Sequence, residues 1–191
     1  MTPKVVVPRI EYLDAINKIP VAFQSYAIRQ ELVRKYSWAI PNKAALIELA
    51  KLSPIVEIGA GTGYLAYLLR KMGVDMLAVD EHPADSRRKA NRYHSFTKAW
   101  TKIEVGGVEK VKEYPDRNLL LCWPPYDEPM AVNCLRAYKG KVLAYIGEGL
   151  GGCTADNQFH DLLEDDFECV ERIDIPQWDG LHDFLSIWKR K

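Results

Sequence analysis

The feature that most constrains the fold is a short apolar strand that runs directly into a glycine-rich turn and then into a helix. The strand covers residues 55–58. Glycine occupies every second position of the turn: Gly59, Gly61 and Gly63. Apolar residues then recur at the spacing of one helix face: Leu65, Leu68, Leu69 and Met72. Gly73 stands where this helix ends, because glycine accepts the left-handed backbone of that position. Such a strand–turn–helix unit is typical of proteins built around a parallel sheet.

The rest of the chain continues this alternation of strands and helices. Further apolar strands are predicted at 74–79, 103–105, 118–122 and 142–146. A polar, helical stretch is expected after residue 80, and another helix near 127–137. Strands near 167–175 and 183–189 have no helix between them, so they form a hairpin and one of them runs antiparallel. The predicted fold class is therefore α/β: a doubly wound, mostly parallel seven-stranded sheet with an antiparallel terminal hairpin.

Residues 1–52 are expected to form a helical N-terminal cap, and residues 53–191 the core of the same single domain. Two helices are predicted within 9–37, because Pro20 interrupts a region rich in helix formers. Asn42 is placed to cap a further short helix. The chain has 191 residues, which is the size of one domain.

The composition excludes several classes of protein. No apolar run reaches the ~18 residues of a membrane span. Arg9, Glu11 and Asp14 interrupt the apolar stretch that a signal peptide would need. Lys and Arg together number 26, as do Asp and Glu, so the zero net charge removes the main argument for bulk binding to nucleic acid. The four cysteines form no Cys-x-x-Cys pair, which argues against a zinc site and favours a reducing, cytoplasmic location.

The turn at 59–63 is suited to a nucleotide-like ligand. The free N–H groups of a helix N-terminus favour electronegative atoms, and glycines let a ligand approach the backbone. Asp80 ends the next strand, where its two oxygens can hold a ribose diol. A dinucleotide fingerprint would need glycine in place of Tyr64, and the Gly-Lys-Ser/Thr ending of a P-loop is absent. A tight turn followed by a surface aspartate is the alternative interpretation.

The segment Val-Glu-Ile-Gly-Ala-Gly-Thr-Gly-Tyr at 56–64 resembles the first motif of class I S-adenosylmethionine-dependent methyltransferases, whose pattern is acidic-x-Gly-x-Gly-x-Gly. The resemblance covers about residues 54–190. It implies a cofactor, S-adenosylmethionine, with three glycines forming the floor beneath it: Gly59, Gly61 and Gly63. It also implies that Glu57 holds the cofactor's ammonium group and that Asp80 binds its ribose hydroxyls. Glu81 would then border the adenine.

The segment Trp123-Pro-Pro-Tyr126 follows the fourth predicted strand, at the sheet edge that faces the ligand. It resembles the Asn/Asp-Pro-Pro-Tyr motif of amino-methyltransferases acting on adenine, cytosine or glutamine amide. Trp123 departs from that motif, because an indole donates one hydrogen bond and accepts none. This departure argues against methylation of a base or amide nitrogen, although Tyr126 can still stack on a flat target. Trp123 either contacts the cofactor's sulfonium by cation–π attraction or fills the core.

Acid–base candidates are expected on loops at the same sheet edge: Asp127, Glu148, His182 and Asp183. Glu148 directly follows a strand in a glycine-rich loop, so it could approach the ligand as a general base, or it is an exposed loop carboxylate. The catalytic candidates are therefore Trp123, Tyr126 and Glu148. His160 and Glu164 share a helix face, but no third ligand accompanies them, and no metal site is predicted.

Residues 87–102 hold six Lys or Arg and no acid, interleaved with three aromatic residues. This stretch is either a patch for RNA or a phosphorylated substrate, or a solvated helix face.

Three residues precede the first sheet strand: Tyr36, Trp38 and Pro41. They either cover the methionine end of the cofactor or pack in the N-terminal helices. The sequence thus predicts a methyltransferase that acts on a small molecule or a protein rather than on duplex DNA. A cofactor-binding module without catalysis and an RNA methyltransferase are the alternatives.

Overall fold

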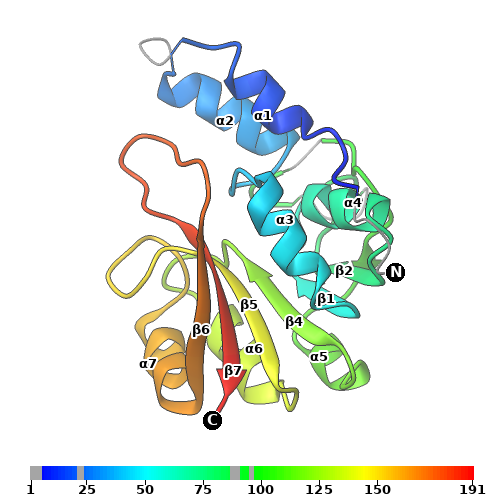
Figure 1. The fold of residues 1–191 in the computed structure, drawn as a ribbon, viewed down its shortest axis with the longest axis vertical. Coiled ribbons are helices and arrows are strands. Elements are labelled where there is room, and N and C mark those ends of the chain that lie inside the picture. The colour runs from blue at the N-terminus through cyan, green and yellow to red at the C-terminus, as the bar shows by residue number, and fades with distance from the viewer. Residues whose placement is uncertain (1–5, 21–23, 87–90, 95–96) are drawn as a thin grey trace.

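The computed structural model of the protein describes residues 6–20, 24–86, 91–94 and 97–191. A seven-stranded sheet in the order β3-β2-β1-β4-β5-β7-β6 forms its centre (Figure 1). The strands are β1 (Ile55–Ile58), β2 (Met76–Asp80), β3 (Glu104–Val105), β4 (Asn118–Cys122), β5 (Val142–Gly147), β6 (Phe167–Asp174) and β7 (Phe184–Arg190). Neighbouring strands run parallel except β7, which is antiparallel to β5 and β6. The predicted doubly wound sheet with an antiparallel terminal hairpin is confirmed.

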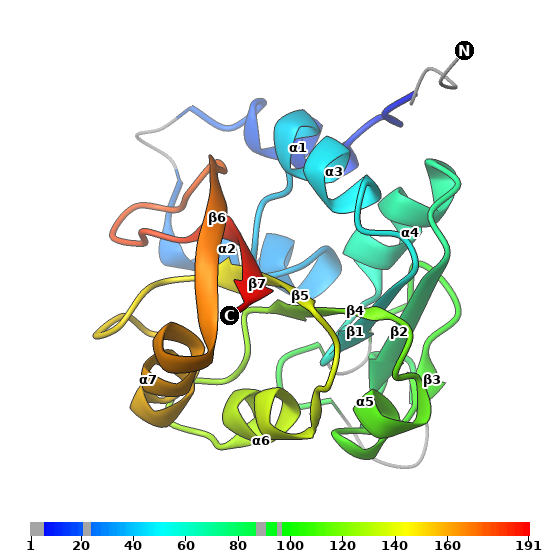
Figure 2. The same ribbon diagram turned by 60° about the horizontal axis from the view of Figure 1, so that its bottom comes forward.

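Helices cover both faces of this sheet (Figure 2). They are α1 (Glu11–Ile16), α2 (Tyr26–Lys35), α3 (Lys43–Ala50), α4 (Tyr64–Lys71), α5 (Glu109–Glu113), α6 (Met130–Ala137) and α7 (Asn157–Asp166). On one face α2, α3 and α4 pack on strand residues such as Ile55 and Leu120, and on the other face α5, α6 and α7 pack on Val56 and Leu119. Successive strand residues point to opposite faces, so the central strands, which are covered on both sides, are mostly apolar. No helix in the described part of the chain is long and apolar enough to cross a membrane.

Helix ends follow the signals in the sequence. The Asn42 side chain accepts a hydrogen bond from the Ala45 N–H at 2.9 Å and caps α3, as predicted. Gly73, just after α4, has a φ of +83°. The two helices predicted around Pro20 are α1 and α2. The sequence does not predict α5, because five residues are too few to display a helical period.

The segment between β2 and β3 differs from the predicted helical stretch. Its described residues, 81–86, 91–94 and 97–103, form turns and irregular backbone. Two backbone hydrogen bonds hold this segment against the glycine-rich turn instead: Ala84 N–H to Gly61 O at 3.3 Å, and Trp100 N–H to Thr62 O at 2.9 Å. These long-range bonds override the local helix propensity of the segment.

An aromatic cluster joins the N-terminal helices to the rest of the molecule. Its members are Tyr12, Tyr36, Tyr64, Tyr67 and Trp100. Tyr36 is stacked against Tyr12, with ring centroids 4.8 Å apart, and against Trp100 at 5.4 Å. The indole Nε1–H of Trp100 also donates to the Lys35 carbonyl at 2.7 Å. The cluster therefore draws α1, the end of α2, α4 and the segment before β3 together at one edge of the sheet.

Candidate functional site

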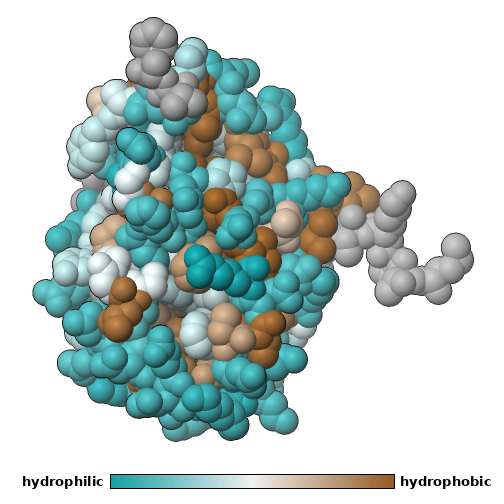
Figure 3. Space-filling view, turned by 60° about the vertical axis from the view of Figure 1, so that its left-hand side comes forward, coloured by the Kyte–Doolittle hydropathy of each residue, from teal (hydrophilic) through white to brown (hydrophobic). Residues whose placement is uncertain are grey.

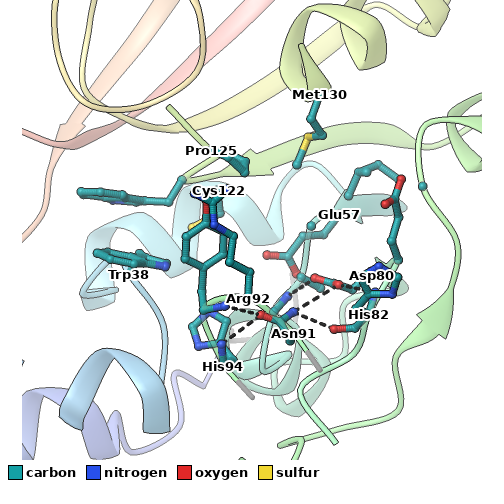
Figure 4. Close-up of a pocket in the computed structure, with 18 of the residues that line it drawn as sticks. Trp38, Glu57, Asp80, His82, Asn91, Arg92, His94, Cys122, Pro125 and Met130 are labelled. Carbon is teal, nitrogen blue, oxygen red and sulfur yellow. Dashed lines mark hydrogen bonds between the residues drawn. The ribbon is translucent and has the colours of Figure 1, made fainter. Parts of the chain in front are cut away.

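A cavity of about 610 Å³ opens at the carboxyl ends of β1, β2 and β4. Ligands of open α/β sheets bind at this edge, and their pockets span roughly 300–1,000 Å³. We call one part of the lining the glycine-loop end: Glu57, Gly59, Gly61 and Asp80. We call the other part the aromatic end: Trp38, Tyr93, Trp123 and Pro125. Figure 4 shows Trp38 on the left of the cavity and Asp80 on the right.

The glycines of the turn are required by both backbone and space. Gly59, Gly61 and Gly63 all have positive φ, which L side chains rarely adopt. A Cβ on Gly59 would lie 2.7 Å from the Met130 methyl carbon, and one on Gly61 would lie 2.8 Å from the His94 ring. Gly63 caps α4 and does not line the cavity. Glycine therefore lets Met130 and His94 pack closely against the turn, and Gly59 and Gly61 line the cavity.

Asp80 is buried at the end of β2, beside the turn. Its Oδ2 accepts the Gly61 N–H at 2.8 Å, and its Oδ1 accepts the His82 N–H at 2.8 Å. Burial raises the pKa of Asp80, and these two hydrogen bonds offset part of that effect. Oδ1 also accepts a longer hydrogen bond from the Asn91 amide, at 3.4 Å. Oδ2 retains a second lone pair, so Asp80 can still accept a hydrogen bond from a ligand's hydroxyl group.

Glu57 lies within β1 and is 2% exposed. Its Oε2 atom is buried without a hydrogen-bond partner among the residues that the structure describes. Burial, and after it the charge of Asp80, raise the pKa of Glu57 to about 8. An unsatisfied buried polar group costs ~1–3 kcal/mol, so its presence in a cavity wall indicates a position that a ligand completes. A carboxylate in this position would bind a cation.

Asn91 and His94 complete this end of the cavity, and neither is predicted from the sequence. The Asn91 amide donates to the His82 carbonyl at 2.6 Å, and its oxygen accepts the N–H groups of Tyr93 and His94, each at 2.9 Å. His94 is thereby seated against Gly61. Burial lowers the pKa of His94 to about 4, so its imidazole is neutral at pH 7. The local sequence signal for this turn is Asn91, because an asparagine side chain can accept hydrogen bonds from the backbone two and three residues ahead.

Glu81 also lines the glycine-loop end, next to the turn that follows β3. A Cβ on Gly107 would lie 2.6 Å from Oε1 of Glu81, so glycine permits this close approach. Gly106, Gly107 and Val108 line the cavity on the same side.

Trp123 lines the cavity in a strained backbone conformation, with a φ of +52°. Its ring stacks on Trp38, with centroids 5.1 Å apart and planes at 16°. Its Nε1–H donates to Oδ2 of Asp183 at 2.8 Å. Of the residues interpreted as a cover, Trp38 lines the cavity, whereas Tyr36 belongs to the aromatic cluster and neither it nor Pro41 lines the cavity.

Tyr126 and Glu148 lie outside the cavity lining. Tyr126 is 64% exposed, because the chain turns away after Pro125, where the Asp127 N–H bonds the Ala155 carbonyl at 3.0 Å. The Glu148 carboxylate is buried and accepts the N–H groups of Cys153 and His182, at 2.8 and 2.7 Å. Burial raises the pKa of Glu148, but these bonds outweigh it and leave the pKa below its ordinary value.

The basic stretch at 87–102 is described only in part, since residues 87–90 and 95–96 lie outside the described residues. Within it, Arg92 forms an ion pair with Glu128 at the cavity lining, and Trp100 belongs to the aromatic cluster. The described aromatic residues of the stretch are thus engaged by the protein itself.

No protein-family model and no curated protein matches the sequence. Among solved structures, the chain is similar to the 1,6-didemethyltoxoflavin-N1-methyltransferase of Burkholderia thailandensis with bound 1,6-didemethyltoxoflavin and S-adenosylhomocysteine. The identity is 15%, the match covers 98% of this chain and 92% of that chain, and the TM-score is 0.56. The magnesium protoporphyrin IX methyltransferase of Synechocystis PCC 6803 gives 12% identity, 78% and 76% coverage and a TM-score of 0.46. The match to the Burkholderia thailandensis enzyme shows that the chain shares the fold of that methyltransferase, which is the fold class that the sequence predicts.

Proposed function

We propose that this protein is an S-adenosylmethionine-dependent methyltransferase that acts on a small molecule in the cytoplasm. The observation that carries the proposal is a buried oxygen of Glu57 that has no hydrogen-bond partner among the described residues and lies in the wall of the cavity that Asp80 also lines. The Glu57 carboxylate would accept a hydrogen bond from a cationic donor, and the Asp80 carboxylate would accept hydrogen bonds from hydroxyl groups. S-adenosylmethionine carries an ammonium group and a ribose in one molecule, whereas a nicotinamide dinucleotide has no ammonium group.

The residues of the glycine-loop end would bind and orient the cofactor. Ionised Glu57 pairs with its ammonium group, and Asp80 accepts hydrogen bonds from its ribose. Gly59 and Gly61 let it lie against the backbone at the N-terminal side of α4. Neutral His94 adds no positive charge beside a sulfonium. When bound, the cofactor supplies a methyl group on a positively charged sulfur, and the protein supplies alignment and a dry site.

The size and charge of the site support a small acceptor molecule. One cavity of about 610 Å³ would hold both cofactor and acceptor. The zero net charge gives no general attraction for nucleic acid. The face drawn in Figure 3 is largely hydrophilic, with small separate apolar patches, which is unlike a broad protein-docking surface. Trp123 would line the part of the cavity in which the acceptor binds. Tyr126 and Glu148 would contribute from positions outside the cavity lining.

Calorimetry with S-adenosylmethionine, S-adenosylhomocysteine and NAD tests the cofactor. Both sulfur compounds should bind, and NAD should not. Asp80→Asn should weaken binding about tenfold, because the amide offers one acceptor oxygen in place of two. Asp85→Asn, an exposed acid five residues along, is the matched control and should leave the affinity unchanged. NAD binding without binding of either sulfur compound would refute the proposal.

Catalysis is tested separately from binding. Protein with cofactor carrying an isotopically labelled methyl group is incubated with a small-molecule fraction, a protein fraction and an RNA fraction of a cell extract. Label should enter the small-molecule fraction. Label in RNA would favour the RNA methyltransferase, and no transfer despite measured binding would favour the non-catalytic module.

A further inference from the structure

Strained backbone and long-range contacts hold the aromatic end of the cavity in place. Trp123 keeps a φ of +52°, a conformation that persists only where the surroundings impose it. Trp38 stacks on it, and the ring of Tyr93 meets Trp38 nearly at right angles, at 83° and 5.9 Å. The guanidinium carbon of Arg29 lies 5.6 Å from the centre of the Trp38 ring. The two stacked indoles therefore form a supported wall.

Asp183 fixes this wall from behind. It directly precedes β7, is 2% exposed and does not line the cavity. Its Oδ2 accepts the Trp123 Nε1–H at 2.8 Å, and its Oδ1 is buried without a partner among the described residues. Its own carbonyl is held by the Gln177 amide at 2.8 Å. Burying a carboxylate is costly, and the hydrogen bond from the Trp123 indole to Asp183 fixes the orientation of that indole.

The wall favours a flat, uncharged ligand. Indole faces stack on other flat π-systems. Arg92 and Glu128, which line the cavity next in sequence to Tyr93 and close to Pro125, neutralise each other in an ion pair. This ion pair therefore offers no unpaired charge that would attract a charged acceptor. The positive charge of Arg29 beside Trp38 also disfavours a second cation on the same stack.

We propose that the acceptor is a small, uncharged, flat aromatic molecule that stacks on the Trp38–Trp123 wall, and that Asp183 is the positioning residue that holds this wall. The inference rests on the proposed methyltransferase function, since it places the acceptor beside a cofactor at the glycine-loop end. Asp183 would position the Trp123 indole and would have no acid–base role.

The first test uses the unaltered protein saturated with S-adenosylhomocysteine. Three probes are titrated by ligand-observed NMR: quinoline, which is flat and uncharged; 2-decalone, an uncharged saturated two-ring ketone; and N-methylquinolinium, which is flat and cationic. Quinoline should bind at least about fivefold more tightly than either of the others, because one stacked ring system contributes that much. Equal affinity for quinoline and 2-decalone would overturn the inference.

The second test separates Asp183 from a general structural role. Asp183→Leu should lower quinoline affinity at least about threefold while S-adenosylhomocysteine affinity stays within twofold, and Asp183→Asn should retain quinoline binding because its amide oxygen still accepts the indole N–H. Asp179→Leu, an exposed acid of the same loop, is the matched control. The Trp123 indole proton, assigned with Trp123→Phe, should exchange slowly in the unaltered protein. Fast exchange there would contradict the role of Asp183 even if Asp183→Leu fails to fold.

The outcomes distinguish this inference from the proposed function. If S-adenosylhomocysteine does not bind at all, the proposed function fails. If it binds and quinoline shows no preference, only the inference fails. A single-stranded RNA oligonucleotide that displaces quinoline, with an affinity that falls steeply with salt, would reassign the flat ring to a nucleic-acid base.

Discussion

At the scale of single residues, the protonation of Glu57 should couple cofactor binding to pH. With its pKa raised to about 8 by burial, Glu57 is mostly protonated at pH 7 in the free protein. A bound ammonium group requires the ionised form of Glu57, so binding should release a proton. The affinity for S-adenosylhomocysteine should therefore increase about tenfold for each unit by which the pH rises toward 8. Calorimetry of S-adenosylhomocysteine in two buffers of different ionisation enthalpy measures that proton. Glu57→Gln should bind more weakly, with little pH dependence; an unaltered proton release in this variant would assign it to another group.

Gly61 is one of the glycines of the turn at which backbone conformation and space both disfavour a side chain. Gly61→Ala places a methyl group 2.8 Å from the His94 ring at a φ of +57°. We expect a loss of stability of about 1–3 kcal/mol and an approximately tenfold weaker affinity for S-adenosylhomocysteine, measured by denaturant unfolding and calorimetry. Gly149→Ala is the control, because a Cβ there meets nothing within 4 Å. Similar losses in both variants would contradict the close packing of His94 on the turn.

At the scale of elements, Glu148 ties the loop after β5 to the loop before β7. Glu148→Ala leaves the N–H groups of Cys153 and His182 without their partner. This should lower the free energy of unfolding by about 1–3 kcal/mol and leave S-adenosylhomocysteine affinity within twofold. Glu164→Ala, an exposed helical acid, should change stability by less than about 0.5 kcal/mol. A large loss of cofactor affinity with unchanged stability would instead place Glu148 in the binding site.

The elements that the sequence predicts are those whose signals are local. Periodicity and end signals place β1, α4 and the turn between them, and with them Asp80 and Glu57. The paths of the long loops depend on contacts between distant residues, such as the Asp127–Ala155 bond that leaves Tyr126 exposed. The same holds after β2, where the described residues form turns and irregular backbone bonded to the glycine-rich turn, and His94 packs against Gly61. Local sequence therefore predicts the strand, turn and helix that carry the glycine-loop end, and tertiary contacts decide which residues join them.

At the scale of the whole molecule, two buried groups should give the stability a characteristic dependence on pH. The pKa of Glu57 lies at about 8 in the folded protein, against an ordinary value of 4.5, so the folded state holds an extra proton between these pH values and stability falls as pH rises. The pKa of His94 lies at about 4, against 6.5, so stability rises with pH between these values. Between about pH 4.5 and 6.5 the effects of Glu57 and His94 on the free energy of unfolding oppose each other. Between about pH 6.5 and 8 only the effect of Glu57 remains of these two.

The free protein should therefore lose about 1.4 kcal/mol of stability per pH unit between pH 6.5 and 8, measured by denaturant unfolding. Glu57→Gln should remove this loss, whereas Glu31→Gln, an exposed carboxyl, should keep it. Saturating S-adenosylhomocysteine should also remove it, because the bound ammonium group keeps Glu57 ionised and lowers its pKa. The buried acid Asp183, whose pKa burial also raises, remains in all three proteins and so cancels from the comparison. A slope that persists in the saturated protein would mean that the ligand's ammonium group does not reach Glu57, and the assignment of this end of the cavity would have to change.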